Sequence, residues 1–247
     1  MVSLTIFDSI YDNKTVKRID YKSFDDFEKV LYRLADGDKY QKKTDAPLIS
    51  PATYKTETTR ANVNVVSWGG FGIVDVDDYE GSIEDIHEKY SKYKYVCYST
   101  ASSTKEHPKF RLVFPLTESV DADKIKHFWF ALNKEIGDIA DAQTKDLSRM
   151  YYVPSRYKNA YNFIFTHDGL VMDPNKLMEQ HRYVVSNESF FDKLPEAIRN
   201  GLVEHRKNQL NNTNFSWTGY KDCPFVNKRQ VEEYKGITGS GWYLQMY

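Results

Sequence analysis

The sequence predicts a protein of the α+β class, in which helices and strands are mixed. Short stretches rich in apolar residues, at 4–7, 95–98 and 110–116, are typical of strands. Longer stretches that begin near Ser23 and Ser82 carry apolar residues at helical spacing. Glycine-containing junctions between strand-like stretches indicate tight turns, which favour antiparallel pairing.

The composition is that of an ordinary globular protein. The chain has 247 residues, of which 40% are hydrophobic and 28% charged, enough for one large domain or a domain with an appendage. Its formal net charge of −1 excludes a uniformly basic nucleic-acid-binding protein, so any anion must be bound by a local patch. The two cysteines, Cys97 and Cys223, lack zinc-ligand spacing, and Cys97 is expected to be a buried thiol.

The N-terminal part begins with a strand at 4–7 and a helix from Ser23, whose hydroxyl and Asp26 resemble a capping box. A polar loop follows over 37–62. The alternating stretch 62–66 predicts a strand, and Gly69-Gly70 predicts a hairpin that joins it to the next strand.

The middle of the chain carries a second helix from Ser82 and a strand at 95–98. If the stretch from His107 onward is extended, His107, Lys109 and Arg111 share one face and Phe110, Leu112 and Phe114 share the other. This pattern predicts an anion-binding face backed by a core face.

The C-terminal part begins with a third helix, at 121–136, that stops at Gly137. We expect a strand over 149–153 and a hairpin over 162–172 about Asp168-Gly169. After Pro174 the chain becomes helical and more basic. The chain ends at Tyr247 with neither a cap nor a polar tail, as expected of a piece of a longer protein; a helix that simply ends there is the alternative.

The stretch 71–79, with the sequence FGIVDVDDY, is a strand that runs into three acids. Asp75 and Asp77 lie on one face of this strand and Asp78 on the other. Two neighbouring carboxylates repel each other unless a cation lies between them, and oxygen-only ligands suit Mg²⁺ or Mn²⁺. The alternative is a strand that runs into a solvated acidic turn.

Three motifs in order resemble those of the archaeo-eukaryotic primase superfamily, the primase–polymerases, in their phage and plasmid replication form. The first is the D-x-D strand at 71–77. The second is the hydroxyl-rich loop at 98–104, followed by the basic strand at 109–116. The third is Asp141 followed by the stretch 146–154. The second motif departs from the family, because Lys109-x-Arg111 stands where Ser-x-His is common. In the third motif Asp141 and Asp146 compete for the metal role, and we favour Asp141.

The resemblance implies an N-terminal α/β part packed on a catalytic module like an RNA-recognition motif, with the site in the cleft between them. The catalytic domain would span residues 1–172. A helical C-terminal extension, 173–247, would follow, in which Trp217, Tyr220 and Trp242 are candidates to stack template bases.

The implied activity is template-dependent nucleotide transfer from an NTP or dNTP to a 3′-hydroxyl on single-stranded DNA, catalysed with two Mg²⁺ or Mn²⁺ ions. A replicative helicase, fused or separate, is a further expected partner. The chain carries no signal peptide and no apolar stretch of membrane-spanning length, so we expect it in the cytoplasm, the host's if it is phage-encoded. The metal ligands would be Asp75, Asp77 and Asp141, and the nucleotide-binding residues Ser99, Thr100, Ser102, Lys109, Arg111 and Arg149.

Two other functions remain open from the sequence. One is a replication initiator or single-stranded-DNA-binding module with a primase fold and little polymerase activity, which the unusual second motif favours. The other is a metal-dependent nuclease, which needs clustered carboxylates but no triphosphate clamp.

Overall fold

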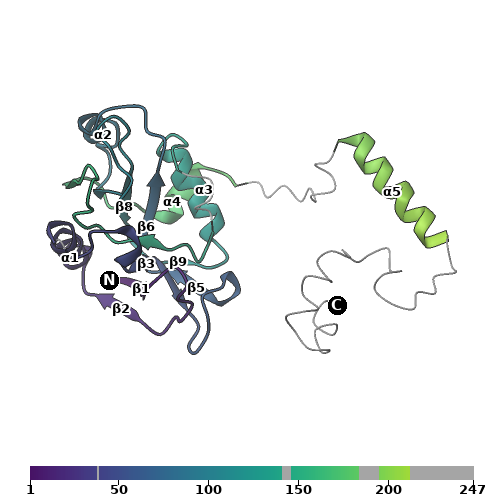
Figure 1. The fold of residues 1–247 in the computed structure, drawn as a ribbon, viewed down its shortest axis with the longest axis horizontal. Helices are drawn as coiled ribbons and strands as arrows, with labels where there is room; N and C mark the ends of the chain where they lie inside the picture. Colours follow the sequence, from purple (N-terminus) through teal and green to yellow (C-terminus); the bar gives the residue numbers. More distant parts are fainter. Residues whose placement is uncertain (38, 141–145, 184–194, 212–247) are drawn as a thin grey trace. The chain divides into compact units, whose positions relative to one another are not determined.

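A computed structural model describes residues 1–37, 39–140, 146–183 and 195–211 (Figure 1). The chain divides into two units, Met1–Val184 and Val185–Tyr247. The second unit is described only in its helix α5 (Glu196–Asn211). Helices and antiparallel strands are mixed in the first unit, so the predicted α+β class is confirmed.

The centre of the first unit is a four-stranded antiparallel sheet in the order β11-β7-β8-β6. Along the chain its strands alternate with helices as β6-α2-β7-β8-α3-β11, a β-α-β-β-α-β order. Strands β6 and β7 both pair antiparallel with β8, which lies between them. The bounds are β6 Phe71–Val76, α2 Ile83–Lys89, β7 Tyr95–Ser99, β8 Phe110–Pro115, α3 Ile125–Glu135 and β11 Ile164–His167.

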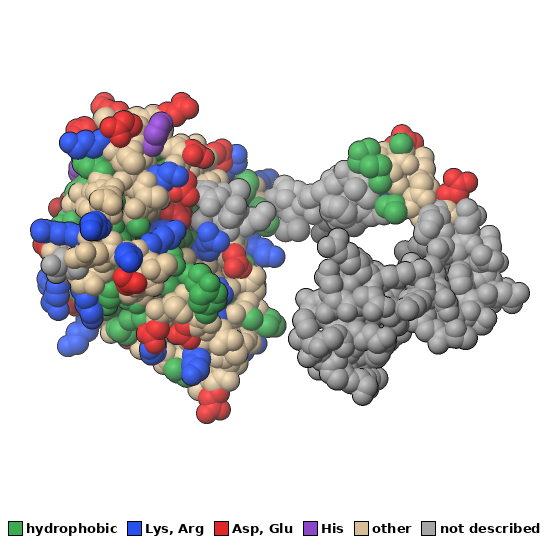
Figure 2. Space-filling view, viewed as in Figure 1, with side chains coloured by type: hydrophobic (Ala, Val, Ile, Leu, Met, Phe, Trp, Pro, Cys, Tyr) green, Lys and Arg blue, Asp and Glu red, His purple; other side chains and the backbone are tan. Residues whose placement is uncertain are grey.

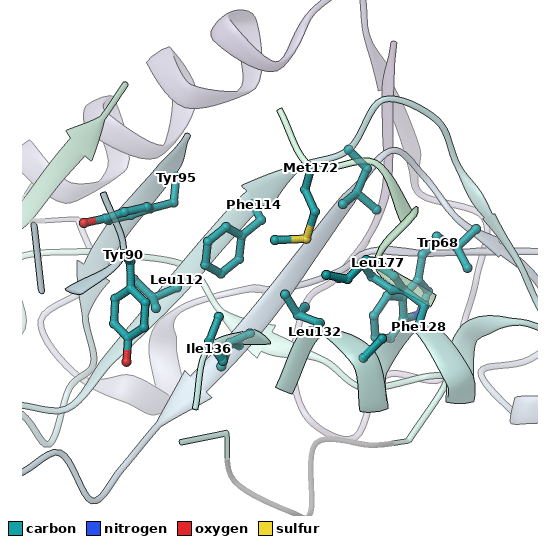
Figure 3. Close-up of a cluster of buried hydrophobic side chains, with 14 of the residues drawn as sticks. Trp68, Tyr90, Tyr95, Leu112, Phe114, Phe128, Leu132, Ile136, Met172 and Leu177 are labelled. Carbon is teal, nitrogen blue, oxygen red and sulfur yellow. The ribbon is translucent and has the colours of Figure 1, made fainter. Parts of the chain in front are cut away.

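Both faces of this sheet are buried, because apolar side chains point alternately to its two sides. On one face, α2, α3 and α4 (Pro174–Gln180) cover a cluster that includes Leu112, Phe114 and Phe128 (Figure 3). On the other face, Ile73, Val96 and Val113 pack in a second cluster with residues of α1 and of a further sheet. The buried central sheet therefore fixes which side chains at its ends can reach solvent.

The second sheet has the strand order β10-β3-β1-β2, and the third has the order β4-β5-β9. Tyr151 of β10 and Ile49 of β3 belong to the second buried cluster, so the second sheet packs on this face of the central sheet. The remaining bounds are β1 Val2–Phe7, β2 Arg18–Tyr21, α1 Phe24–Asp36, η1 Lys43–Asp45, β3 Leu48–Ser50, β4 Ala52–Tyr54, η2 Asn62–Asn64, β5 Val65–Trp68, β9 Val120–Asp121 and β10 Tyr151–Tyr152.

The helix starts predicted at Ser23 and Ser82 are confirmed, whereas the third helix begins at Ile125 and not at Asp121, which lies in β9. Ser23 accepts a hydrogen bond from the backbone N–H of Asp26, and Ser82 forms a complete capping box with Asp85. Gly137 ends the third helix with a φ of +83°, a conformation that glycine adopts without strain. Cys97 is fully buried in β7, as predicted.

Both predicted hairpins are wrong. The stretch 62–66 is a short 3₁₀ helix followed by β5, and β5 pairs with β4 and β9 while β6 pairs with β8. Gly69 and Gly70 carry the chain from one sheet to the other. A Cβ on Gly69 would lie 2.1 Å from the carbonyl oxygen of Ser3, so only glycine lets the two backbones approach this closely.

The predicted hairpin at Asp168-Gly169 is not formed, because β11 pairs with β7. The residues after Gly169 form isolated parallel bridges instead, Leu170 with Tyr93 and Met172 with Leu116. The first unit extends past residue 172, since Leu177 of α4 is buried in the same cluster as α3. In the described part of the chain, no helix is both long and apolar enough to cross a membrane.

Candidate functional site

Asp75 is the single acid within β6, and its register partner on β8 is Arg111. Both side chains are nearly buried, with 11% and 8% of their surfaces exposed. Arg111 Nε lies 3.0 Å from Asp75 Oδ1, and Nη2 donates to Asp75 Oδ2 at 3.3 Å. The same-face placement that the alternation predicts thus becomes a cross-strand ion pair.

Arg111 is held on every side. Its Nη1 donates to the carbonyl oxygen of Tyr152 at 3.0 Å, and its guanidinium lies 5.9 and 5.7 Å from the ring centroids of Tyr98 and Tyr151. Burial by itself would lower the pKa of Arg111, but the charge of Asp75 outweighs it and the pKa lies above its ordinary value. Burial raises the pKa of Tyr98 to about 12, so both groups keep their protons near neutral pH.

A pocket of about 450 Å³ opens beside this ion pair. It contains acids from two separate segments and cations from four, and it lies where the second sheet meets the central one. Its lining residues are Ile10, Lys43, Leu48, Arg60, Asp75, Asp77, Thr100, Ser102, Arg111, Asp146, Arg149, Met150 and Tyr152.

The pocket brings Asp75 and Asp77 together with Asp146. Asp78 is exposed and does not line it, as the strand alternation predicts. Asp141 lies outside the described residues, so its predicted metal role stays a prediction. Asp146, the competing acid, is the one that the structure places in the pocket.

The donor set fits a hard divalent cation. Asp75 and Asp77 both line the pocket, and Asp75 Oδ1 lies 3.0 Å from Arg111 Nε. Within the described ranges, no three His, Cys, Asp or Glu side chains lie close enough to hold a metal ion by themselves. Two carboxylates completed by substrate phosphates are a normal way to bind Mg²⁺, and Asp75 and Asp77 suit it.

Four cations line the pocket, of which the sequence pointed to Arg111 and Arg149. Lys43 and Arg60 lie in a stretch that the sequence marks only as a polar loop, and no local pattern distinguishes them. The buried Nε of Arg60 has no hydrogen-bond partner in the described structure. Lys109 does not line the pocket, and its Nζ lies 3.6 Å from Asp77.

The hydroxyl-rich loop reaches the pocket with Thr100 and Ser102, whose oxygens lie 3.3 Å apart. Ser99 does not line the pocket, because its buried hydroxyl accepts a hydrogen bond from the backbone of Phe163. His107 is exposed and also lies outside the lining. The aromatic residues expected to stack template bases, Trp217, Tyr220 and Trp242, lie outside the described residues.

Comparisons with known proteins were made for the sequence and for the fold. A model of the VapE N-terminal domain family matches residues 54–189, which is more than half of the chain. No curated protein matches the sequence significantly. A solved structure of the cyanophage S-2L primase-polymerase AEP domain matches with a TM-score of 0.40 and 12% identity, covering 56% of this chain and 70% of that one. That similarity is too distant to assign a role to any residue.

Proposed function

The chain belongs to the VapE N-terminal domain family, and from this membership and its three motifs we propose that it is the catalytic part of a primase–polymerase in phage or plasmid replication. It would transfer nucleotides from an NTP or dNTP to a 3′-hydroxyl on a single-stranded DNA template. The family agrees with the resemblance to the archaeo-eukaryotic primase superfamily. The activity itself rests on the chemistry of the pocket.

The observation that carries the proposal is that one pocket combines acids and cations from distant segments. Asp75 lies in β6 and Asp77 just after it, Asp146 and Arg149 precede β10, and Arg60 precedes β5. Nucleotidyl transfer needs carboxylates for divalent cations and positive side chains for a triphosphate, and little else from the protein.

Asp75 and Asp77, with Asp146 or Asp141 as a third acid, would hold the Mg²⁺ or Mn²⁺ ions, which when bound neutralise phosphate charge and acidify the attacking hydroxyl. Arg111 acts through Asp75. Because its donors engage Asp75 and the carbonyl of Tyr152, it holds that carboxylate in place beside the pocket. Arg111 is therefore a positioning residue, and the triphosphate clamp assigned to it from the sequence passes to other cations.

Arg149, Arg60 and Lys43 are these cations, since all three line the pocket and none has a carboxylate within 4 Å in the described structure. A guanidinium can hold two phosphate oxygens at once, and Arg60 and Arg149 both line the pocket. Thr100 and Ser102 add hydroxyl donors on the opposite segment. Together they would orient the triphosphate and exclude water from its charged oxygens.

A replication initiator that binds single-stranded DNA with little polymerase activity is the second candidate. One observation favours it: both cations of the second motif pair with the acids of the first, Arg111 with Asp75 and Lys109 with Asp77. If these pairs persist when nucleotide is present, the pocket holds less charge for metal and triphosphate.

The deciding experiment is nucleotide incorporation on a primed single-stranded DNA template with Mg²⁺ or Mn²⁺. We expect the intact chain to extend the primer and the double variant Asp75→Asn, Asp77→Asn to lose about 10³-fold or more of that rate, because the metal ligands lose their charge. Asp78→Asn, which alters the exposed neighbouring acid, is the matched control and should retain the rate.

No extension by the intact chain, with binding of the template retained, would favour the initiator. Cleavage of the template without extension would favour a nuclease. Extension that survives the double substitution would overturn the assignment of Asp75 and Asp77.

A further inference from the structure

The pocket of about 450 Å³ beside Asp75 and Arg111 is called the nucleotide pocket below. A second pocket, of about 350 Å³, adjoins it and shares Lys43 and Ser102 with it. It lies between the segment after α1 and the segment after β10. We call it the basic pocket; its lining residues are Gln41, Lys42, Lys43, Ala101, Ser102, Tyr157, Lys158 and Asn159. A ligand in one pocket can therefore continue into the other.

Backbone hydrogen bonds tie the two walls of the basic pocket together. Lys158 N–H donates to the carbonyl of Gln41 at 2.9 Å, and the Ser155 hydroxyl donates to the carbonyl of Tyr40 at 2.7 Å. Asn162 brackets Tyr157, accepting from its N–H at 3.0 Å and donating to its carbonyl at 2.8 Å. These hydrogen bonds hold together the backbone segments that carry Lys42 and Lys158.

The charge of the basic pocket is unopposed. None of its lining residues is an Asp or a Glu, and Lys42, Lys43 and Lys158 have no carboxylate within 4 Å in the described part of the chain. In contrast, Lys109 and Arg111 beside the nucleotide pocket both pair with acids. Figure 2 shows lysine and arginine side chains gathered along one side of the first unit, while the chain as a whole carries a net charge of −1.

We propose that the basic pocket binds the phosphodiester backbone of a single-stranded nucleic acid that continues into the nucleotide pocket, an inference that rests on the proposed function. Three lysines without acids suit phosphates that arrive without a metal ion, unlike a triphosphate held with Mg²⁺. The volume of the basic pocket, about 350 Å³, is of the order of one nucleotide.

The basic pocket grips the backbone and does not select bases. Tyr157 is 3% exposed and its hydroxyl donates to Val153, so its ring is not a stacking platform. Lysine ammonium groups act as point charges toward phosphate and carry no sequence information. Binding should therefore tolerate any sequence and depend strongly on salt.

The test is binding of a fluorescein-labelled oligothymidylate to the full chain, followed by anisotropy between about 50 and about 200 mM salt. In the double variant Lys42→Gln, Lys158→Gln we expect about tenfold weaker binding and a salt slope smaller by about 1.4, because two contacts are lost at about 0.7 each. Affinity for a free dNTP with Mg²⁺ should fall less than about twofold, since neither lysine lines the nucleotide pocket.

The matched control is Lys22→Gln with Lys89→Gln, which removes the same charge from exposed lysines just before α1 and in α2. It should keep the wild-type slope, and unchanged circular dichroism would show that both variants fold. If the Lys42→Gln, Lys158→Gln variant bound the single strand with wild-type affinity and wild-type salt slope, the inference would be overturned. Equal weakening toward duplex DNA would also overturn it.

The two proposals fail separately. If the chain binds the oligonucleotide through Lys42 and Lys158 but incorporates no nucleotide, the proposed function fails and the basic pocket stands. If the chain extends primers while the variant binds them normally, the proposed function stands and the basic pocket is wrong.

Discussion

At the scale of single residues, the pairing of Asp75 with Arg111 decides how the first motif works. A carboxylate buried to this extent is stable only beside a compensating charge, and β8 supplies that charge directly across the strand. The sequence places a cation on the correct face of its strand, but only the register of β6 on β8 sets it opposite Asp75 and not opposite Asp77.

Arg111→Gln should lower the free energy of unfolding by about 3–5 kcal/mol, because it leaves the buried charge of Asp75 alone. Adding Asp75→Asn should recover part of this loss, since the double variant has no unpaired charge. Urea unfolding of the two single variants and the double variant measures the coupling.

The matched control at this scale is Lys109→Gln. Its partner, Asp77, is 44% exposed, so the cost should be below about 1 kcal/mol. Equal losses for Arg111→Gln and Lys109→Gln would show that burial does not set the strength of the first pair.

At the scale of elements, the contact between α3 and α4 explains why the first unit extends past residue 172. Glu135, in the last turn of α3, accepts hydrogen bonds from Lys92, Tyr93 and His181, and His181 follows α4. Burial alone would raise the pKa of Glu135, but these three donors outweigh it and lower the pKa from 4.5 to about 2.

This lowered pKa gives stability a defined pH dependence. The stability that the ionised Glu135 carboxylate contributes is fully present above about pH 4.5, the pKa of this group in the unfolded chain. It is lost as the pH falls toward about 2. Between about pH 5 and about pH 3, Glu135→Gln should therefore lose less stability than the wild type, as measured by urea unfolding. The exposed acid of α2 provides the control Glu84→Gln, whose profile should follow the wild type; a Glu135→Gln profile parallel to the wild type would contradict the expectation.

At the scale of the whole molecule, both apolar clusters and both pockets are built from residues of the first unit. A chain that ends at Val184 contains everything that these clusters need. We expect it to unfold in one cooperative transition with the same thermal midpoint as the first unit of the full chain, measured by circular dichroism. A midpoint lower by more than about 5 °C, or loss of cooperativity, would show that the second unit contributes to this core.

The sequence by itself determined the class of the fold, the two capped helices, and the strand whose acids Asp75 and Asp77 line the pocket while Asp78 does not. These depend on periodicity and on local capping, which residues close in the chain decide. It was wrong about the two hairpins, because a turn signal does not say which strand the next one will pair with. That choice depends on burying both faces of the central sheet.

Only the tertiary structure decided which residues share a pocket. Lys43 precedes β3 of the second sheet and Arg60 lies between β4 and β5 of the third, so they join Asp75 only once these sheets and the central one are packed. No local pattern in their polar loop predicts this. The register of β6 on β8 pairs Arg111 with Asp75, which is why we propose that Arg111 positions this carboxylate and does not clamp the triphosphate. Local patterns assign residues to the faces of strands and helices, whereas contacts between segments far apart in the sequence assign them to a site, and these exist only once the sheets are packed.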